Sequence, residues 1–375
     1  MSVRRQSVLG FKARLSAPEP FSSTDLLYQA AAKEGLLVTL DRALRQSAID
    51  LFASLPPEPE RLLFLDFETS TIDHGVVGSG YIWEQVRQAG LSPKNVVINI
   101  SESDAKDNDA LKKFIDNYRG RGFLIALSDV GSGHSNLSRV ALARPDILEI
   151  GSPLVGDLHR DPIKQEIFKA LMTLAHKIGA LVLASDTRRE EEALLALEMG
   201  VDMVEGPLWE PFTSDMAALN ERISRTAAAF KSYTVDKKKA QSARERTEDL
   251  MVGKLVKDLS ALTTDRFESR LAEMVRENPG VECLFILNDK GRQVTDAVWN
   301  SSRPVRENVL FRPARRGADH SMKDYYFLLT DDFVTRFRSE PYISQASGSL
   351  CVTLSGSFRD ASNENHVLCV DLPIS

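Results

Sequence analysis

The chain has 375 residues, of which 43% are hydrophobic and 27% are charged, and its formal net charge at pH 7 is −6. That length is enough for one barrel of about 230 residues and a smaller domain. The acidic balance argues against nonspecific nucleic-acid binding, and no run approaches the roughly 18 apolar residues of a membrane span. The basic N-terminus lacks an apolar core of signal-peptide length. We therefore expect a soluble, cytoplasmic protein that binds neither membranes nor nucleic acid.

Short apolar runs alternate with helical patterns through the first part of the chain. Strand-like runs occur at 7–15, 62–66, 96–100, 123–128, 147–150, 180–184 and 203–205. Amphipathic stretches such as 41–53, 104–118 and 162–178 lie between them. This alternation is typical of β/α units and predicts a mostly parallel barrel with helices outside.

The pattern changes at residues 214–276 to a long and highly charged helical region. Its apolar positions Leu250, Met251, Leu255, Val256 and Leu259 keep helical spacing. One interpretation is a solvated linker helix. The other is a dimerising signalling helix, because an apolar seam needs a partner.

Beyond Pro279 the chain has short β-rich runs, and Asp289-Lys290-Gly291 between two of them is a hairpin signal. The three cysteines lie in this part, in apolar surroundings typical of buried strands, and form no CxxC pair, which fits a reducing cytoplasm. An aromatic segment at 324–327 precedes a Tyr-Ile-Ser strand and a meander. This arrangement, over residues 268–375, resembles PAS-like sensor domains of the Cache type.

The sensor resemblance implies a small-molecule pocket in this domain. Its candidate residues are Tyr325, Tyr326, Tyr342 and Asp371. The simpler interpretation makes the tyrosines core residues whose hydroxyls are satisfied. Asp324 stands where amino-acid-binding members often have an arginine, which argues against recognition of an amino-acid carboxylate.

Three motifs in the first part carry a second resemblance. They are GSGHSNL at 131–137, LAHKIG at 174–179 and MGVDMVEGPLWEP at 199–211. With their spacing, they make residues 5–225 similar to the EAL domain family, bacterial phosphodiesterases that hydrolyse cyclic di-GMP. The resemblance implies an α/β fold with an EAL-type modified TIM (β/α)8 barrel, a linking helix and an α+β PAS/Cache-like domain. We expect these parts at 1–225, 226–267 and 268–375.

The EAL resemblance also implies where the family's two divalent cations, Mg or Mn, would be held by oxygen ligands and activate a water. The family's Glu-Ala-Leu signature corresponds to Lys12-Ala13-Arg14. The eight corresponding ligand and lysine positions are Lys12, Asp66, Asn99, Ser128, Asp129, Glu149, Ser185 and Glu205, and a further acid is kept as Glu102. Of the eight, only Asp129 keeps the family's residue type. The resemblance thus implies a degenerate, vestigial pocket.

Charge decides what such a pocket can hold. The eight positions sum to −3, and without cations they would repel a dianionic dinucleotide. One like-charge pair at about 4 Å costs roughly 4 kcal/mol at an effective dielectric near 20. We therefore expect no catalytic residue, no bound metal or other cofactor, and no tight binding of cyclic di-GMP. A structural interpretation makes Lys12 a buried partner of Asp66 or Glu149.

The function expected from these observations is a catalytically inactive EAL-like signalling protein that acts through protein–protein contacts. We expect a homodimer, a protein partner of unknown identity and a small-molecule ligand of the C-terminal sensor-like domain. The alternative is a cyclic di-GMP phosphodiesterase or binder with a rearranged metal site at Asp66, Asp129, Glu149 and Glu205. A third hypothesis is a metabolite sensor that acts through the C-terminal domain alone.

Overall fold

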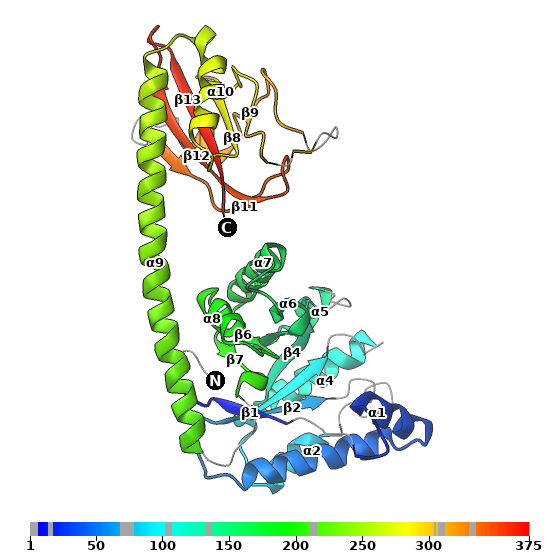
Figure 1. Cartoon of the computed structure of the whole chain (residues 1–375). Coiled ribbons are helices and arrows are strands. Elements are labelled where there is room, and N and C mark those ends of the chain that lie inside the picture. Colours follow the sequence, from blue (N-terminus) through cyan, green and yellow to red (C-terminus); the bar gives the residue numbers. More distant parts are fainter. Residues whose placement is uncertain are drawn as a thin grey trace. The chain divides into compact units, whose positions relative to one another are not determined.

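The computed structural model describes residues 7–13, 18–67, 79–101, 107–131, 137–209, 216–303, 305–306, 312–329 and 335–374. The chain divides into two compact units, Met1–Asp236 and Lys237–Ser375, and Figure 1 labels many of their elements. The boundary between them falls inside one continuous helix of 45 residues, α9 (Met216–Ser260).

The first unit is built on a parallel sheet of seven strands in chain order, a β/α half-barrel. The strands are β1 (Gly10–Lys12), β2 (Leu62–Phe67), β3 (Val96–Ser101), β4 (Leu124–Val130), β5 (Ile147–Ile150), β6 (Leu181–Ala184) and β7 (Met203–Val204). Each predicted strand run overlaps one of them, so the parallel β/α prediction is confirmed. Where the resemblance implied eight strands, the described residues contribute seven to this sheet.

Helices follow most of these strands. They are α1 (Thr24–Lys33), α2 (Leu37–Ala53), α3 (Tyr81–Gln88), α4 (Asn108–Gly120), α5 (Leu137–Ala143), α6 (Ser152–Val155), α7 (Pro162–Ile178) and α8 (Glu190–Glu198), with 3-10 turns η2 (Pro93–Asn95) and η3 (Pro207–Trp209). Local sequence fixes their ends. The Asp161 carboxylate accepts the first free N–H groups of α7, Pro162 fits its first turn, and Gly179 ends it with φ of 77°.

Both faces of the parallel sheet are covered, which explains why its strands read as continuous apolar runs. One set of strand residues packs against the helices, for example Leu63, Ile98 and Ile125 with Phe114 of α4. The alternating set forms a separate cluster on the other face: Phe64, Val97, Ala126, Ile147, Leu183 and Met203. The polar ends of the strands therefore stand out against an apolar interior.

The second unit contains a six-stranded antiparallel sheet. Its elements are η4 (Thr264–Arg266), α10 (Phe267–Glu277), β8 (Cys283–Asn288), β9 (Val298–Trp299), α11 (Asp324–Phe327), β10 (Arg336–Arg338), β11 (Tyr342–Ile343), β12 (Leu350–Arg359) and β13 (Asn365–Pro373). The strand order is β10-β12-β13-β8-β9, with β11 paired to β12. The predicted hairpin turn is present: the Asn288 N–H donates to the Arg292 carbonyl, and Gly291 takes φ of 71°.

The apolar seam of α9 packs within its own unit. Leu255 and Leu259 are buried in a core with Phe267 of α10 and with strand residues such as Leu284 and Val352. Leu250, by contrast, is 70% exposed. Part of the predicted linker is thus an integral layer of the second unit, because the sheet covers its seam.

The three cysteines, Cys283, Cys351 and Cys369, lie in β8, β12 and β13, where they are buried and unpaired, as predicted. Among the described residues, no helix has both the length and the apolar character required to cross a membrane.

Candidate ligand site at the carboxyl edge of the parallel sheet

The candidate residues of the first unit gather where the parallel strands end. Parallel strands bring their carboxyl ends to one edge, and that edge carries the functional groups of β/α barrels. The described residues at this edge, in strand order, are Lys12, Asp66, Asn99, Ser128, Asp129, Glu149, Ser185 and Glu205. Glu102 lies outside the described residues.

Four of these side chains form one connected network. The Lys12 Nζ donates to Glu149 Oε1 at 2.7 Å and lies 3.5 Å from Asp66 Oδ1. The Asn99 Nδ2 donates to Asp66 Oδ1 at 2.7 Å and to Glu149 Oε2 at 3.1 Å. Asp66 and Asn99 are register partners on β2 and β3, whereas Lys12 and Glu149 come from β1 and β5, which are not neighbours in the sheet.

The acids around Lys12 stabilise its protonated, positively charged form. Burial alone would lower the pKa of Lys12, but attraction by Glu149, Asp66 and Glu205 outweighs it, so this pKa is raised. Burial raises the pKa of Glu149, and the Lys12 ammonium partly offsets that shift. Glu149 is only 3% exposed, whereas Asp66 faces solvent. The edge therefore combines an internal ion pair with an accessible carboxylate.

The remaining edge residues divide into structural and exposed groups. The Ser128 and Ser185 hydroxyls are buried and donate to the carbonyls of Ile100 and Ile150 on neighbouring strands. Asp129 is exposed and takes φ of 59°, a left-handed conformation that is unusual for a residue with a side chain. In the described contacts Asp129 makes no hydrogen bond or ion pair with the Lys12 network.

Sequence reasoning missed two charged residues beside this edge. Asp186 follows Ser185 directly and also takes a left-handed φ of 59°. Its carboxylate pairs with the exposed Arg188 at 3.0 Å. The signal was available, because a charged run follows the end of β6 in the sequence.

A divalent cation does not fit between Asp66 and Glu149 as these residues are arranged. Asp66 Oδ1 and both oxygens of Glu149 already face N–H donors. Asn99 turns its amide nitrogen to the carboxylates, while its Oδ1, the atom a metal would use, is buried without a hydrogen-bond partner. An ammonium holds that position instead.

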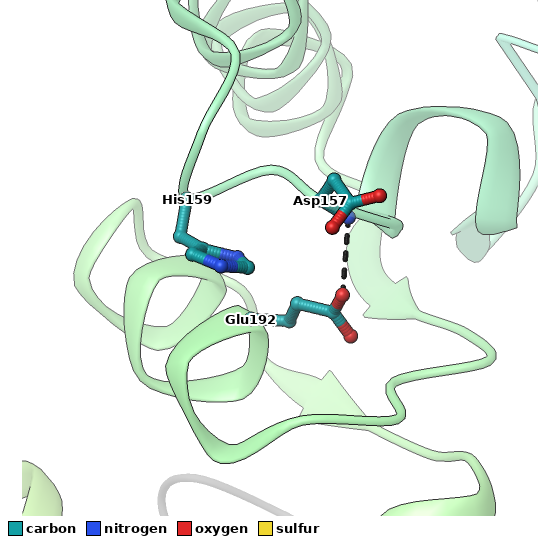
Figure 2. A group of neighbouring side chains, drawn as sticks. All are labelled: Asp157, His159 and Glu192. Carbon is teal, nitrogen blue, oxygen red and sulfur yellow. Dashed lines mark hydrogen bonds between the residues drawn. The ribbon is translucent and has the colours of Figure 1, made fainter.

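A second group of metal-ligand types is Asp157, His159 and Glu192, whose ligand atoms lie within 4.8 Å of one another. Figure 2 shows the Asp157 backbone N–H donating to the Glu192 carboxylate, at 3.0 Å. The other Glu192 oxygen accepts the N–H groups of Arg188 and Arg189 at the start of α8. Since both carboxylate oxygens accept backbone N–H groups, Glu192 caps the start of α8 and fixes the backbone at Asp157.

In the second unit, two of the four sensor candidates share a hydrogen-bonded chain. The Tyr342 hydroxyl lies 2.7 Å from Thr353 Oγ1, which donates to Asp371 Oδ1 at 2.7 Å. Burial raises the pKa of Asp371 to about 7, and nearby Glu282 adds to the shift. This carboxyl group therefore changes its charge near neutral pH, where an ordinary aspartate is fully ionised.

The other two candidates, on α11, have separate partners. The Tyr325 hydroxyl lies 2.6 Å from His320 Nδ1, and the Tyr326 hydroxyl donates to the Asp289 carbonyl at 2.7 Å. Both rings pack in a cluster with Phe285. Their hydroxyls are satisfied within the fold, as the core interpretation of these tyrosines requires.

Comparison with known proteins gives the relatives of this chain. The EAL-domain-containing protein YkuI of Bacillus subtilis (strain 168) is 23% identical over 394 residues, which cover all of this chain and 92% of YkuI. The probable cyclic di-GMP phosphodiesterase PdeA of Escherichia coli (strain K12) is 26% identical over 131 residues. That match covers 35% of this chain and only 18% of PdeA.

Solved structures share the fold. The crystal structure of YkuI in complex with cyclic di-GMP and calcium aligns with a TM-score of 0.74 and 23% identity, covering all of this chain and 94% of YkuI. Klebsiella pneumoniae BlrP1 with calcium and cyclic di-GMP gives a TM-score of 0.52 and 24% identity over 56% of this chain and 53% of BlrP1. A further BlrP1 structure contains manganese with the dinucleotide.

These findings correct the function expected from the sequence. The main hypothesis, a catalytically inactive signalling protein that acts through protein–protein contacts, is wrong. A relative of the same architecture over the whole chain is solved with that dinucleotide and calcium, so the alternative of a phosphodiesterase or binder fits better. The charge sum does not contain the contacts within the edge, where Lys12 and Asn99 donate to Glu149 and Asn99 also donates to Asp66, and these contacts agree with the interpretation of Lys12 as a buried partner of Asp66 or Glu149.

The family itself follows from the extent of the match. A model of the EAL domain matches residues 1–211, more than half of the chain and the whole parallel sheet. This chain belongs to the EAL domain family.

Proposed function

We propose that this chain binds cyclic di-GMP at the carboxyl edge of its parallel sheet. The observation that carries the proposal is the network of Lys12, Asp66, Asn99 and Glu149, which keeps a polar and partly charge-compensated edge on an otherwise apolar half-barrel. The full-length likeness to YkuI, solved with that dinucleotide, supports it.

The chemistry of the ligand suits both signs of charge at this edge. Cyclic di-GMP carries two phosphates, which need cationic or N–H donors, and Lys12 supplies an ammonium. It also carries two guanine bases, whose amino groups are hydrogen-bond donors. The exposed carboxylates of Asp66 and Asp129 can accept from them, so acids at the edge need not face phosphate.

Calorimetric titration of the full chain with cyclic di-GMP tests this proposal. We expect saturable binding by the wild type and a loss of about tenfold or more for Lys12→Met, because two carboxylates then face the ligand without their cation. Lys112→Met is the matched control, since Lys112 is exposed and its ion pair among the described residues is with Asp116 on the surface of α4. A wild type that takes up no dinucleotide at millimolar concentration would refute it.

Turnover measured in the same samples with Mg2+ or Mn2+ distinguishes a binder from a phosphodiesterase with a rearranged site. Product formation that Asp129→Asn abolishes would identify the phosphodiesterase. Binding without product in either metal would identify the binder. The edge residues outside the Lys12 network, including Glu205, are part of this proposal.

We also propose that residues 268–375 form a PAS/Cache-like sensor domain, joined to an EAL-like barrel at 1–225 by the helical segment 226–267. The antiparallel sheet, the aromatic helix α11 and the chain from Tyr342 to Asp371 support this assignment. Homodimer formation, a protein partner and a cytoplasmic location remain predictions. Light scattering of the full chain at several concentrations measures the first.

A further inference from the structure

The Lys12 ammonium lies where two carboxylates from different strands converge. It is 2.7 Å from Glu149 Oε1 and 3.5 Å from Asp66 Oδ1, and the side chains of Lys12 and Glu149 are 14% and 4% exposed. Glu149 and Asp66 are also tied together by the two donors of the Asn99 amide. The carboxylate oxygens of Asp66 and Glu149 are therefore held close together, with the Lys12 ammonium between them.

Oxygen atoms from two carboxylates and one amide are the donors that hard divalent cations prefer. Three features of this cluster favour an ammonium over a divalent cation. The ammonium contacts an oxygen of each acid, Asn99 presents its nitrogen rather than its oxygen, and a second cation a few ångströms from Lys12 would be repelled. The residues and their orientation are thus consistent with one internal monovalent cation.

We propose that the Lys12 ammonium replaces a divalent cation between Asp66 and Glu149, and that removing it turns these residues into a divalent-cation site. A consequence, which rests on the proposed function, is that the wild type binds cyclic di-GMP without a metal at this position.

Titration of the full chain with Mn2+ alone, followed by electron paramagnetic resonance, tests the cation replacement without any nucleotide. Four variants are compared with the wild type. Lys12→Met keeps the length of the side chain without its charge, and Lys12→Arg keeps the charge. Lys12→Met combined with Glu149→Gln removes a ligand from the new site, and Glu149→Gln alone tests whether the wild type already holds a cation there.

We expect Lys12→Met to bind Mn2+ at least about tenfold more tightly than the wild type, because the ammonium that repels a second cation is gone. Lys12→Arg should behave like the wild type, and the added Glu149→Gln should abolish the gain. A folded Lys12→Met protein that gains no Mn2+ binding overturns the proposal. So does a wild type whose Mn2+ site is lost in Glu149→Gln.

If Lys12→Met does not fold, as judged by circular dichroism, the last comparison decides alone. Matching Mn2+ curves for the wild type and Glu149→Gln support the proposal, and a site lost in Glu149→Gln overturns it.

Titration with cyclic di-GMP in EDTA and in Mn2+ then tests the consequence for the ligand. We expect the wild-type affinity to be the same in both, and Lys12→Met to bind well only with Mn2+. A wild-type affinity that depends on Mn2+ and on Glu149 overturns the inference. No dinucleotide binding in either condition refutes the proposed function, and the Mn2+ titrations without nucleotide still decide the cation replacement.

Discussion

The two units each bury a carboxylate at the end of a strand, and they stabilise it in different ways. In the first unit, Glu149 faces an ammonium, because Lys12 reaches it from β1. In the second, burial and the repulsion of Glu282 raise the pKa of Asp371 to about 7, although the hydrogen bond from the Thr353 hydroxyl lowers that pKa. One unit compensates a buried carboxylate with an opposite charge, and the other favours the protonated form of the buried acid. Their responses to mutation and to pH should therefore differ.

The largest effect is expected from Lys12→Met in the first unit. Removing one partner of a buried ion pair leaves the other charge uncompensated and destabilises by about 3–5 kcal/mol. Denaturant unfolding of the full chain, with the first unit followed by Trp83, measures the loss. Adding Glu149→Gln should restore much of the free energy of unfolding, because the uncompensated charge is then gone. A loss below about 1 kcal/mol would show that the Lys12–Glu149 pair contributes no more than an exposed ion pair, and the proposed difference between the two units would then be wrong.

Glu192 adds a third case to this comparison, because backbone N–H groups rather than an ammonium or a proton stabilise its buried carboxylate. Glu192 accepts the N–H groups of Asp157, Arg188 and Arg189, so Glu192→Ala should cost about 2 kcal/mol by leaving these donors unpaired. The control is Glu190→Ala in the same helical turn, where the side chain is exposed. Equal losses in the two variants would mean that the cap does not stabilise the fold.

The raised pKa of Asp371 predicts that the stability of the second unit depends on pH. Because the folded pKa of Asp371 is about 7 and its ordinary value is 3.8, the folded state holds the proton more tightly than the unfolded state. This group's contribution to stability is then greatest at low pH and falls as the pH rises through about 7. Between pH 6 and pH 8 the loss should be on the order of 1 kcal/mol. Thermal unfolding of the wild type and Asp371→Asn at both pH values checks it, and the variant should lack the difference.

The smallest effect should come from an exposed pair. Lys112 and Asp116 lie 3.2 Å apart on α4, with side chains that are 60% and 56% exposed. Lys112→Met should change the free energy of unfolding by about 0.3–0.5 kcal/mol, because solvent screens the pair. A loss as large as that of Lys12→Met would show that burial is not what separates them.

Much of this arrangement could be predicted from the sequence. Apolar runs ending in polar residues indicated the strands, and parallel strands necessarily bring Lys12, Asp66, Asn99 and Glu149 to one edge. The net charge of the edge, by contrast, carries no information about which atoms face each other. The double donation by Asn99 depends on the orientation of one amide, which no sequence pattern encodes.

The second unit shows the same limit. Its hairpin and its cysteine-bearing strands could be predicted from turn residues and β-rich runs. The chain from Tyr342 through Thr353 to Asp371 could not, because it depends on the register of β11, β12 and β13. Register in such hairpins is set by turn geometry and loop length together with the buried face, and a one-residue shift would turn these side chains to the other face of the sheet.

The positions of the cysteines offer a way to watch the two units separately. All three thiols lie in strands of the second unit, where burial raises the pKa values of Cys283 and Cys369 and raises that of Cys351 to about 12. The neutral, enclosed thiol is a poor nucleophile, so alkylating reagents should reach these groups only when that sheet opens. The half-barrel carries no cysteine and does not react with the reagent. The rate of thiol alkylation therefore measures how often the antiparallel sheet opens, independently of the half-barrel.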